Sequence, residues 1–284
     1  MAFLQAVIEH GFLQHALIGG VLASIGCGIV GSYVVVRRIG FLAGGISHSV
    51  LGGMGAALYF GLEPLSGAVA AALFSALLIG WVSLRWREHE DTLIGALWAV
   101  GMAVGILFIS RTPGYNVNLM SYLFGNILMV PERELWVMAA MDLLVVVAVV
   151  LFYRPFQAVA FDEEFARLRG VPVTAFYLLL LCMVALTVVL LIQVVGLILV
   201  IALLTLPAAI AAQYVHTLGR MMGLATLLGI LFTVSGLALS YEPDLPAGAT
   251  IILVAGLAYL LSTVGRGVWR GRRARLGTQG VRDG

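Results

Sequence analysis

The chain is a series of apolar runs of about 20 residues, the length with which an α-helix crosses a bilayer, separated by short segments that carry the charges. Since backbone polar groups in lipid must be satisfied within the chain, and the short alternating pattern of barrel strands is absent, the predicted fold class is all-α. We expect a polytopic membrane protein of about eight to nine transmembrane helices. The nine candidate spans are 12–36, 41–60, 64–84, 92–110, 133–153, 173–195, 197–215, 221–240 and 249–265.

The arginines predict how the spans are oriented. With nine alternating spans, one side of the membrane receives only Arg111 and Arg133, and the other receives the remaining fourteen of the 16 basic residues, which are all arginine. The arginine-rich side is expected to be cytoplasmic, which places the amino terminus outside and the carboxyl terminus inside. The chain divides into a single transmembrane domain, 1–265, and a basic cytoplasmic tail, 266–284, which we expect to be disordered at the membrane surface.

Composition limits the chemistry of the chain. Hydrophobic residues make up 62% and charged residues 11%, and the mean hydropathy is +1.07. No lysine is present, which excludes a P-loop lysine and a Schiff base, and no His-Glu-x-x-His or Gly-x-Ser-x-Gly pattern occurs. We expect the chain not to be an enzyme; if ATP drives it, another subunit must bind the nucleotide. Met1 to Gln14 lacks the pattern of a removable signal peptide, so the first span is expected to be retained.

One apolar run carries a histidine on a stripe of small residues. At helical spacing His48 shares a face with Gly40, Gly44 and Gly52. Such a face lets another helix approach closely, so His48 is expected to face protein or a pathway rather than lipid. Two interpretations are open: a neutral imidazole bonded to a neighbouring helix, or a group that lines a substrate route, as polar residues inside membranes often do. We favour the second.

A short helix is predicted in the cytoplasmic loop, at about 161–170. Asp162 can cap its amino end, and Gly170 and Pro172 can stop it. The first turn is acidic and the last turn basic, which matches the helix dipole. An apolar face, formed by Phe161, Phe165 and Leu168, would not be needed on a solvated helix. This helix therefore packs on the lipid boundary or on a partner protein, and the residues alone leave both open.

Several separated segments together resemble a known family, the integral membrane permeases of ATP-binding-cassette importers for divalent metals, which are the zinc, manganese and iron uptake systems of bacteria. The resemblance runs from about Ser32 to Leu261. The segments that carry it, in order along the chain, are Arg37-Arg38 before the run around Ser47-His48, Asp91-Thr92-Leu93-Ile94-Gly95, Leu119-Met120-Ser121-Tyr122-Leu123-Phe124-Gly125, Phe161-Asp162-Glu163-Glu164-Phe165-Ala166 with Gly170, Val195-Gly196 through Pro207-Ala208, and Leu245-Pro246-Ala247-Gly248.

The resemblance implies the permease subunit of an importer of zinc, manganese or ferrous iron, with the architecture of vitamin B12- and metal-type permeases. It implies a multi-pass location in the bacterial inner membrane, among lipids, and a homodimer around one central route. A cytoplasmic ATPase dimer and an extracytoplasmic metal-binding protein would be its partners; no nucleic acid and no permanently bound cofactor are implied, and the metal is cargo. The short cytoplasmic helix resembles the element that such permeases seat in a groove of the ATPase, with coupling residues Asp162, Glu163, Phe165, Leu168, Arg169 and Gly170.

The chain departs from the family pattern at the expected metal site. Many zinc and manganese members carry an aspartate four residues before the membrane histidine, where this chain has Gly44, and Asn118 and Asn126 stand where some relatives have carboxylates. Because two or more ligands are normally needed to hold a dication, His48 needs partners. Three sources are open: the second protomer's copy of His48, its neighbours Ser47, Ser49 and Met54, or Asp142 in the span at 133–153.

Two other functions remain as alternatives. One is a permease for cobalamin or iron-siderophore complexes, whose later half carries a similar glycine-rich segment, proline and Leu-Pro-x-Gly turn. The other is a self-contained channel or an intramembrane enzyme that uses His48 and Asp142, which would leave the capped cytoplasmic helix unexplained. The sequence does not indicate which metal is transported, or whether the two permeases of a dimer are identical.

Overall fold

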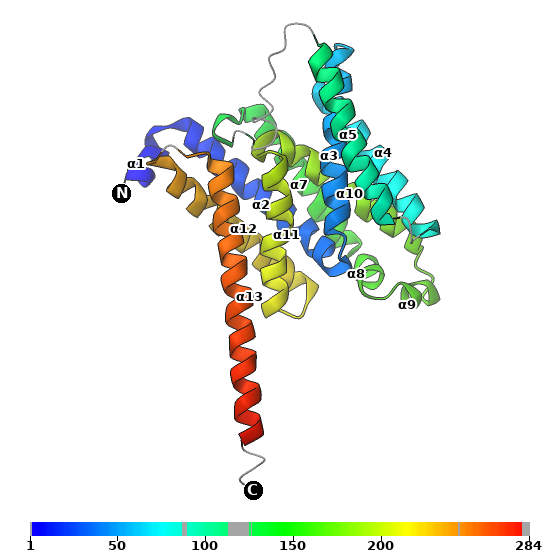
Figure 1. Cartoon of the computed structure of the whole chain (residues 1–284), viewed down its shortest axis with the longest axis vertical. Coiled ribbons are helices and arrows are strands. Elements are labelled where there is room, and N and C mark those ends of the chain that lie inside the picture. The colour runs from blue at the N-terminus through cyan, green and yellow to red at the C-terminus, as the bar shows by residue number, and fades with distance from the viewer. Residues whose placement is uncertain (1, 87–89, 113–124, 126, 244, 280–284) are drawn as a thin grey trace.

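The structure is a computed structural model and describes residues 2–86, 90–112, 125, 127–243 and 245–279. Throughout these ranges the regular elements are helices (Figure 1). They are α1 (Ala2–Glu9), α2 (Gly11–Arg37), α3 (Gly40–Tyr59), α4 (Pro64–Arg85), α5 (Glu90–Arg111), η2 (Ile127–Met129), α7 (Glu132–Leu151), α8 (Tyr153–Phe161), α9 (Glu163–Leu168), α10 (Val173–Val195), α11 (Leu197–Tyr214), α12 (Leu218–Tyr241) and α13 (Ala247–Gln279).

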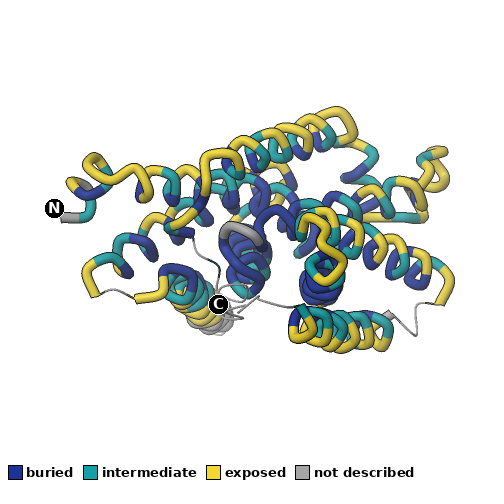
Figure 2. Tube along the Cα trace, turned by 90° about the horizontal axis from the view of Figure 1, so that it is seen from above, coloured by how far each residue is buried: buried dark blue, intermediate teal, exposed yellow. Residues whose placement is uncertain are grey.

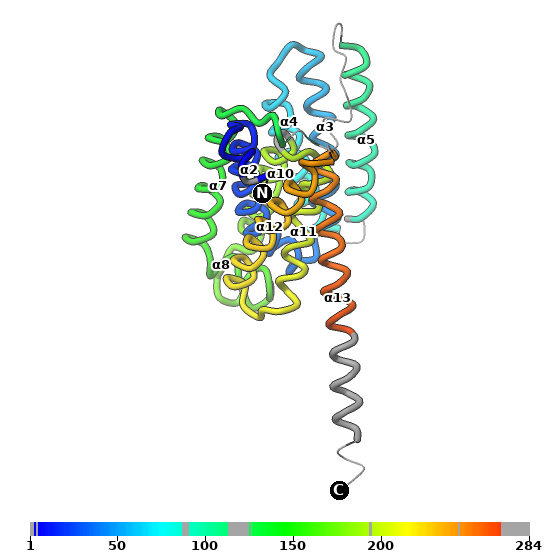
Figure 3. The backbone as a smooth tube through the Cα atoms, turned by 90° about the vertical axis from the view of Figure 1, so that its left-hand side faces the viewer, coloured from blue at the N-terminus to red at the C-terminus, as the bar shows by residue number. Residues whose placement is uncertain are grey.

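Nine of the described helices are long and apolar enough to cross a membrane: α2, α3, α4, α5, α7, α10, α11, α12 and α13. This confirms the predicted all-α, polytopic fold class, with boundaries that differ from the sequence estimate by a few residues. Pro64 opens α4, where its missing N–H would lack a partner in any case. α8 and α9 lie at the end of the molecule toward which the carboxyl-terminal helix projects (Figures 1 and 3).

The helices form two groups. α2 packs against α7, α10, α11 and α12, whereas α3 packs chiefly against α4 and α5, with further contacts to α10 and α11. In Figure 1 the group of α3, α4 and α5 stands on the right, α11 stands near the centre, and α12 and α13 stand to its left. The view down the bundle shows buried positions concentrated on the central helices and exposed positions along the outer ones (Figure 2).

The small-residue face predicted for the run around His48 is a close helix contact. A Cβ placed on Gly52 would lie 2.9 Å from the carbonyl oxygen of Gly101 in α5, and Gly53 and Gly67 oppose each other in the same way between α3 and α4. α3 is therefore in backbone contact with a neighbour on two sides. Lipid offers no hydrophobic drive to bring helices together, so van der Waals contact of this kind holds the group together.

Two short helices were not predicted from the sequence. α1 precedes the first span, and α8 precedes the predicted cytoplasmic helix. α8 packs on the end of α2 through Phe156, whose ring lies 5.6 Å from that of Tyr33. Most of the segment between α5 and α7 lies outside the described residues, and η2 is the helix that the structure describes there.

α13 continues from the last span through Arg266 to Gln279 without a break, so it includes most of the basic tail. Arginine, leucine and alanine are good helix formers. Extending an existing helix also avoids the cost of nucleating a new one, so a tail attached to a transmembrane span needs little else to stay helical.

Gly53→Ala tests the close contact between α3 and α4. The added methyl meets the Gly67 backbone, so we expect a loss of about 1–3 kcal/mol in the free energy of unfolding. The measurement is thermal unfolding in detergent. Gly256→Ala is the matched control, since a Cβ on Gly256 in α13 meets nothing within 4 Å. An unchanged melting temperature in Gly53→Ala would contradict the contact.

Candidate functional site

His48 is enclosed by two residues of α5. Only 8% of its surface is exposed. Its ring stacks on the indole of Trp98 with centroids 4.0 Å apart and an interplanar angle of 15°. Its Nδ1 lies 3.1 Å from the thioether sulfur of Met102. The imidazole thus faces protein, as the stripe predicts, and its polar contact among the described residues is with sulfur, which is a weak acceptor.

Trp98 fills the space at the position where the family pattern has a carboxylate. A Cβ placed on Gly44 would lie 3.2 Å from Cζ3 of this indole, and the Phe41 ring lies on it at a centroid distance of 6.0 Å. A longer side chain at position 44 would collide with the indole. The described donors at His48 are therefore an imidazole and a thioether, both neutral. No cluster of three or more His, Cys, Asp or Glu occurs in the described part of the chain.

The hydroxyl groups proposed to supplement His48 are engaged elsewhere. Ser47 donates to the Ala43 carbonyl of its own helix at 2.7 Å. Ser49 donates to the Ile46 carbonyl and accepts a 2.8 Å hydrogen bond from Ser75 in α4. The side chain whose polar atom lies beside the His48 ring is Met102 of α5.

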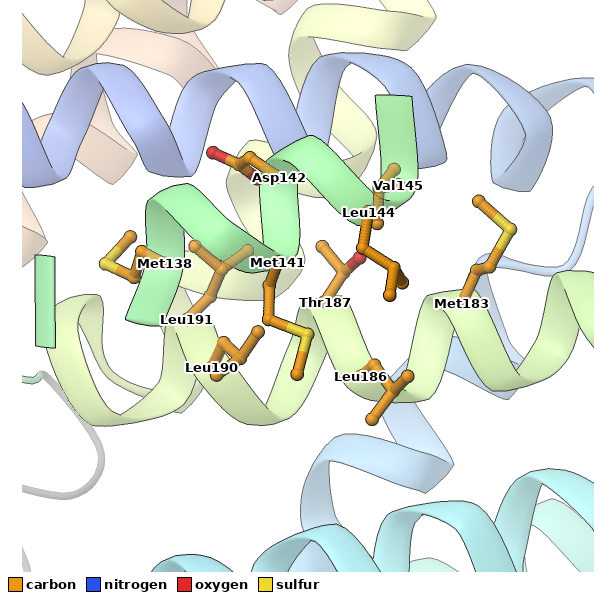
Figure 4. Close-up of a pocket in the computed structure, with 10 residues that line it drawn as sticks. All are labelled: Met138, Met141, Asp142, Leu144, Val145, Met183, Leu186, Thr187, Leu190 and Leu191. Atoms are coloured by element: carbon orange, nitrogen blue, oxygen red, sulfur yellow. The ribbon is translucent and has the colours of Figure 1, made fainter. Parts of the chain in front are cut away.

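Asp142 belongs to a different helix junction. Its carboxyl points at α2, where a Cβ on Gly26 would lie 2.7 Å from Oδ1, so the glycine leaves the room that the carboxyl occupies (Figure 4). Between α7 and α10 the same residue lines a cavity of about 20 Å³ together with Thr187. Asp142 Oδ2 and Thr187 Oγ1 are buried without a hydrogen-bond partner among the described residues.

The surroundings of Asp142 separate it from His48. α7 packs against α2, α8 and α10, whereas the His48 ring is covered from α5. The cavity beside Asp142 has room for about one water molecule and is too small for a hydrated dication. The structure therefore does not bring together the pair of His48 and Asp142 that the sequence left open.

The predicted cytoplasmic helix is present as α9. The Asp162 carboxylate caps it by accepting a 2.9 Å hydrogen bond from the Phe165 N–H. Gly170 has φ +77° and donates its N–H to the Arg167 carbonyl at 3.0 Å, which ends the helix in a left-handed turn that favours glycine. The apolar side chains at this helix are exposed. Phe161, the last residue of α8, is 60% exposed, and Phe165 and Leu168 of α9 are 49% and 88% exposed.

Arg37, the last residue of α2, contacts the loop that carries this helix. Its guanidinium donates to Glu163 of α9 at 2.5 Å and to the Val159 carbonyl of α8 at 2.9 Å. It also lies over the Tyr177 ring of α10, 5.1 Å from the centroid. The side chains of Arg37 and Glu163 are each only 16% exposed. A cation and a carboxylate this well enclosed hold their positions better than an exposed surface pair.

Sequence reasoning missed Trp98 and Met102. They are four residues apart on α5, so one helix face presents both, and Gly101 and Gly105 beside them permit close packing against α3. An aromatic and a thioether on the small-residue side of a neighbouring span were the available signal. Asn118 and Asn126, which the sequence placed at family carboxylate positions, lie outside the described residues.

Comparison with known proteins identifies the family. The model of the ABC 3 transport family matches residues 9–266. The chain belongs to this family. It is therefore a transport protein rather than an enzyme, and with nine apolar helices in its described part it is a multi-pass protein of the bacterial inner membrane.

Several relatives align with nearly the whole chain. An uncharacterised membrane protein of Synechocystis is 48% identical over 92% of each chain. The manganese transport system membrane protein MntC of Halalkalibacterium halodurans is 35% identical over 96% of each. Among solved structures, a chain of PsaBC from Streptococcus pneumoniae in complex with Fab is 31% identical with a TM-score of 0.83, over 92% of this chain and 94% of that one. The agreement extends across the membrane domain.

Asp162→Ala tests the cap of α9. Removal of the acceptor for the Phe165 N–H is expected to cost about 1 kcal/mol of helix stability. The measurement is hydrogen exchange of the amides in 163–168, which should speed up several-fold. Asp162→Asn keeps a capping acceptor and serves as the control. Equal exchange in the Ala and Asn variants would show that the cap does not stabilise the helix.

Proposed function

We propose that the chain is the permease subunit of an ATP-driven importer that takes up a divalent metal cation. The observation that carries this proposal is the pair of His48 and Met102 inside the membrane domain of an ABC transport protein. Two ligands bound to one metal at about 2.0–2.3 Å each lie roughly 3.1 Å apart at right angles and roughly 3.5 Å apart at the tetrahedral angle of zinc. The imidazole nitrogen and the thioether sulfur are 3.1 Å apart.

The donor set supports weak and transient binding. A transported ion must leave as readily as it enters, so a site that held a dication tightly would stop transport. Both described donors are neutral, and the bond that His48 gives up to a metal is only a weak one to sulfur. Imidazole and thioether donors suit zinc and ferrous iron, whereas manganese prefers carboxylates. Because one relative is named a manganese transport system membrane protein, manganese is the metal with which zinc and ferrous iron are compared in the uptake experiment.

The proposed assembly has two permeases, a pair of cytoplasmic ATPases and an extracytoplasmic metal-binding protein. We place the ATPase at α9, because this helix is capped at both ends and still exposes an apolar face. A partner protein that covers this face would remove it from water. A second protomer would bring a second His48 and Met102 to a shared route and raise the number of donors to four.

The alternative functions have less support. A cobalamin or siderophore complex needs a roomy cavity, whereas His48 is packed against Trp98 and Met102. A self-contained channel gives no reason for the exposed apolar face of α9.

His48→Ala tests the route. In cells that lack their own high-affinity importers and carry this chain with its partners, uptake of radiolabelled zinc or ferrous iron is expected to fall at least about tenfold. Met102→Leu, which keeps the volume and removes the sulfur donor, is expected to reduce the same uptake. His216→Ala, an exposed histidine before α12, is the control for histidine removal. Unchanged uptake in His48→Ala at equal protein amount would make His48 a packing residue, and faster manganese than zinc uptake in the wild type would contradict the donor preference.

Replacing Phe165 and Leu168 together by Ala tests the docking of the ATPase. Loss of the exposed apolar face is expected to reduce co-purification of the ATPase with the tagged chain by at least about tenfold, since two such side chains contribute about 1.5–3 kcal/mol each when buried. Leu253 and Leu257 of α13 are similarly exposed and four residues apart, and their double Ala variant is the control. Undiminished co-purification would assign α9 to the lipid boundary instead.

A further inference from the structure

The side chain of Arg37, in the first segment of the sequence signature, belongs neither to the metal route nor to the exposed apolar face of α9. It ends α2, which crosses the membrane, yet its guanidinium turns onto the cytoplasmic loop. One donor group reaches α9 through Glu163, another reaches α8 through the Val159 carbonyl, and the planar face covers Tyr177 of α10. A charge at the end of α2 that served only to complement the helix dipole would need none of these partners.

The turn that follows Arg37 joins α2 tightly to α3. Arg38 has φ 60° and ψ 30°, a left-handed conformation that is uncommon for a residue with a side chain. Its N–H donates to the Val35 carbonyl at 3.2 Å, and the N–H of Ile39 donates to the Val34 carbonyl at 3.0 Å. α3 then starts at Gly40. With two hydrogen-bonded residues between the helices, a displacement of the end of α2 moves the start of α3.

Aromatic contacts continue from this turn to His48. Phe41, in the first turn of α3, lies against Trp98 with centroids 6.0 Å apart, and Trp98 stacks on His48. Gly40 and His48 are separated by about 12 Å along the helix axis, or two turns. Figure 1 shows α8 and α9 at the same end of the molecule as the turn between α2 and α3.

We infer that Arg37 is a positioning residue that transmits movement of α8 and α9 to α3, and through α3 to the surroundings of His48. The inference rests on the proposed function, in which an ATPase moves α9. Glu163 and the Val159 carbonyl are held by one rigid guanidinium fork, so both short helices move with the end of α2. Arg37 does not touch the metal; it couples two sites.

The test is the uptake of metal per ATP hydrolysed, in vesicles that contain the complex of this chain with its ATPase. In Arg37→Gln we expect this ratio to fall about tenfold, within the range of known coupling effects, while the ATPase still co-purifies. Arg37→Lys keeps the charge at the end of α2 and loses the fork, so it should recover only part of the ratio. Arg38→Gln is the matched control, because Arg38 is the adjacent arginine and is exposed.

Glu163→Gln, and the double variant that combines it with Arg37→Gln, complete a double-mutant cycle. If Arg37 and Glu163 form one link, the double variant is no worse than Arg37→Gln alone. Additive losses would overturn the link, and so would an unchanged ratio in Arg37→Gln. A fall in uptake and in ATP hydrolysis that only follows the amount of assembled complex would show a structural role. If the Arg37→Gln chain does not assemble with its ATPase, metal uptake and ATP hydrolysis are measured for Glu163→Gln instead, and their ratio decides whether the link exists.

A second readout separates the inference from the proposed function. Phe41 is 50% exposed at the start of α3, so Phe41→Cys in a Cys182→Ala background reports movement there through its rate of thiol labelling. We expect ATP to change this rate several-fold in the complex, and Arg37→Gln to abolish the change. If the wild type transports no metal but the labelling depends on ATP and on Arg37, the proposed function fails and the link stands. ATP-dependent labelling that persists in Arg37→Gln overturns the link.

Discussion

Backbone contact along glycine-rich helix faces is the constraint on which the rest of this structure depends. Between helices in lipid, attraction comes from the fit of surfaces rather than from release of water, so a face that lacks side chains gains the most from contact. α3 uses such faces toward α5 and α4, and α2 uses Gly28 and Gly31 to meet α12 and α11. Where one large side chain stands on such a face, the neighbour must make room for it. His48 is that side chain, and Trp98 and Met102 form its enclosure.

The same constraint explains how far sequence could predict this protein. Three features depend on residue spacing within one segment: the positions of the spans, the cap at Asp162, and the packing of His48 on protein rather than lipid. That spacing is visible in the sequence. Which helix faces of different segments pair with each other is not visible there. The sequence could therefore not exclude Asp142 as a partner of His48, and it did not indicate Trp98 and Met102, because that choice is made by helix packing and not by local pattern.

Gly44 shows why a missing residue has to be interpreted together with its surroundings. From the family pattern alone, the absent carboxylate leaves a gap in a metal site that some other acid should fill. In the structure no gap remains, because the Trp98 indole occupies the space beside Gly44 and stacks on the imidazole. Gly44 and the aromatic ring on α5 form one arrangement, because the glycine leaves the space that the indole occupies. The groups beside His48 in this arrangement are an indole and a thioether.

Neutral donors in the membrane and a paired charge at its cytoplasmic edge belong to the same physical problem. A fixed carboxylate inside the bilayer would hold a dication strongly and would itself cost free energy when the site is empty. If His48 and Met102 hold the metal as proposed, their imidazole and thioether add no fixed carboxylate to the membrane domain, and Trp98 can stack directly on the imidazole. The energy for moving an ion must then enter from outside the membrane. Arg37, held by α8, α9 and α10 at the end of α2, stands where such energy would reach α3.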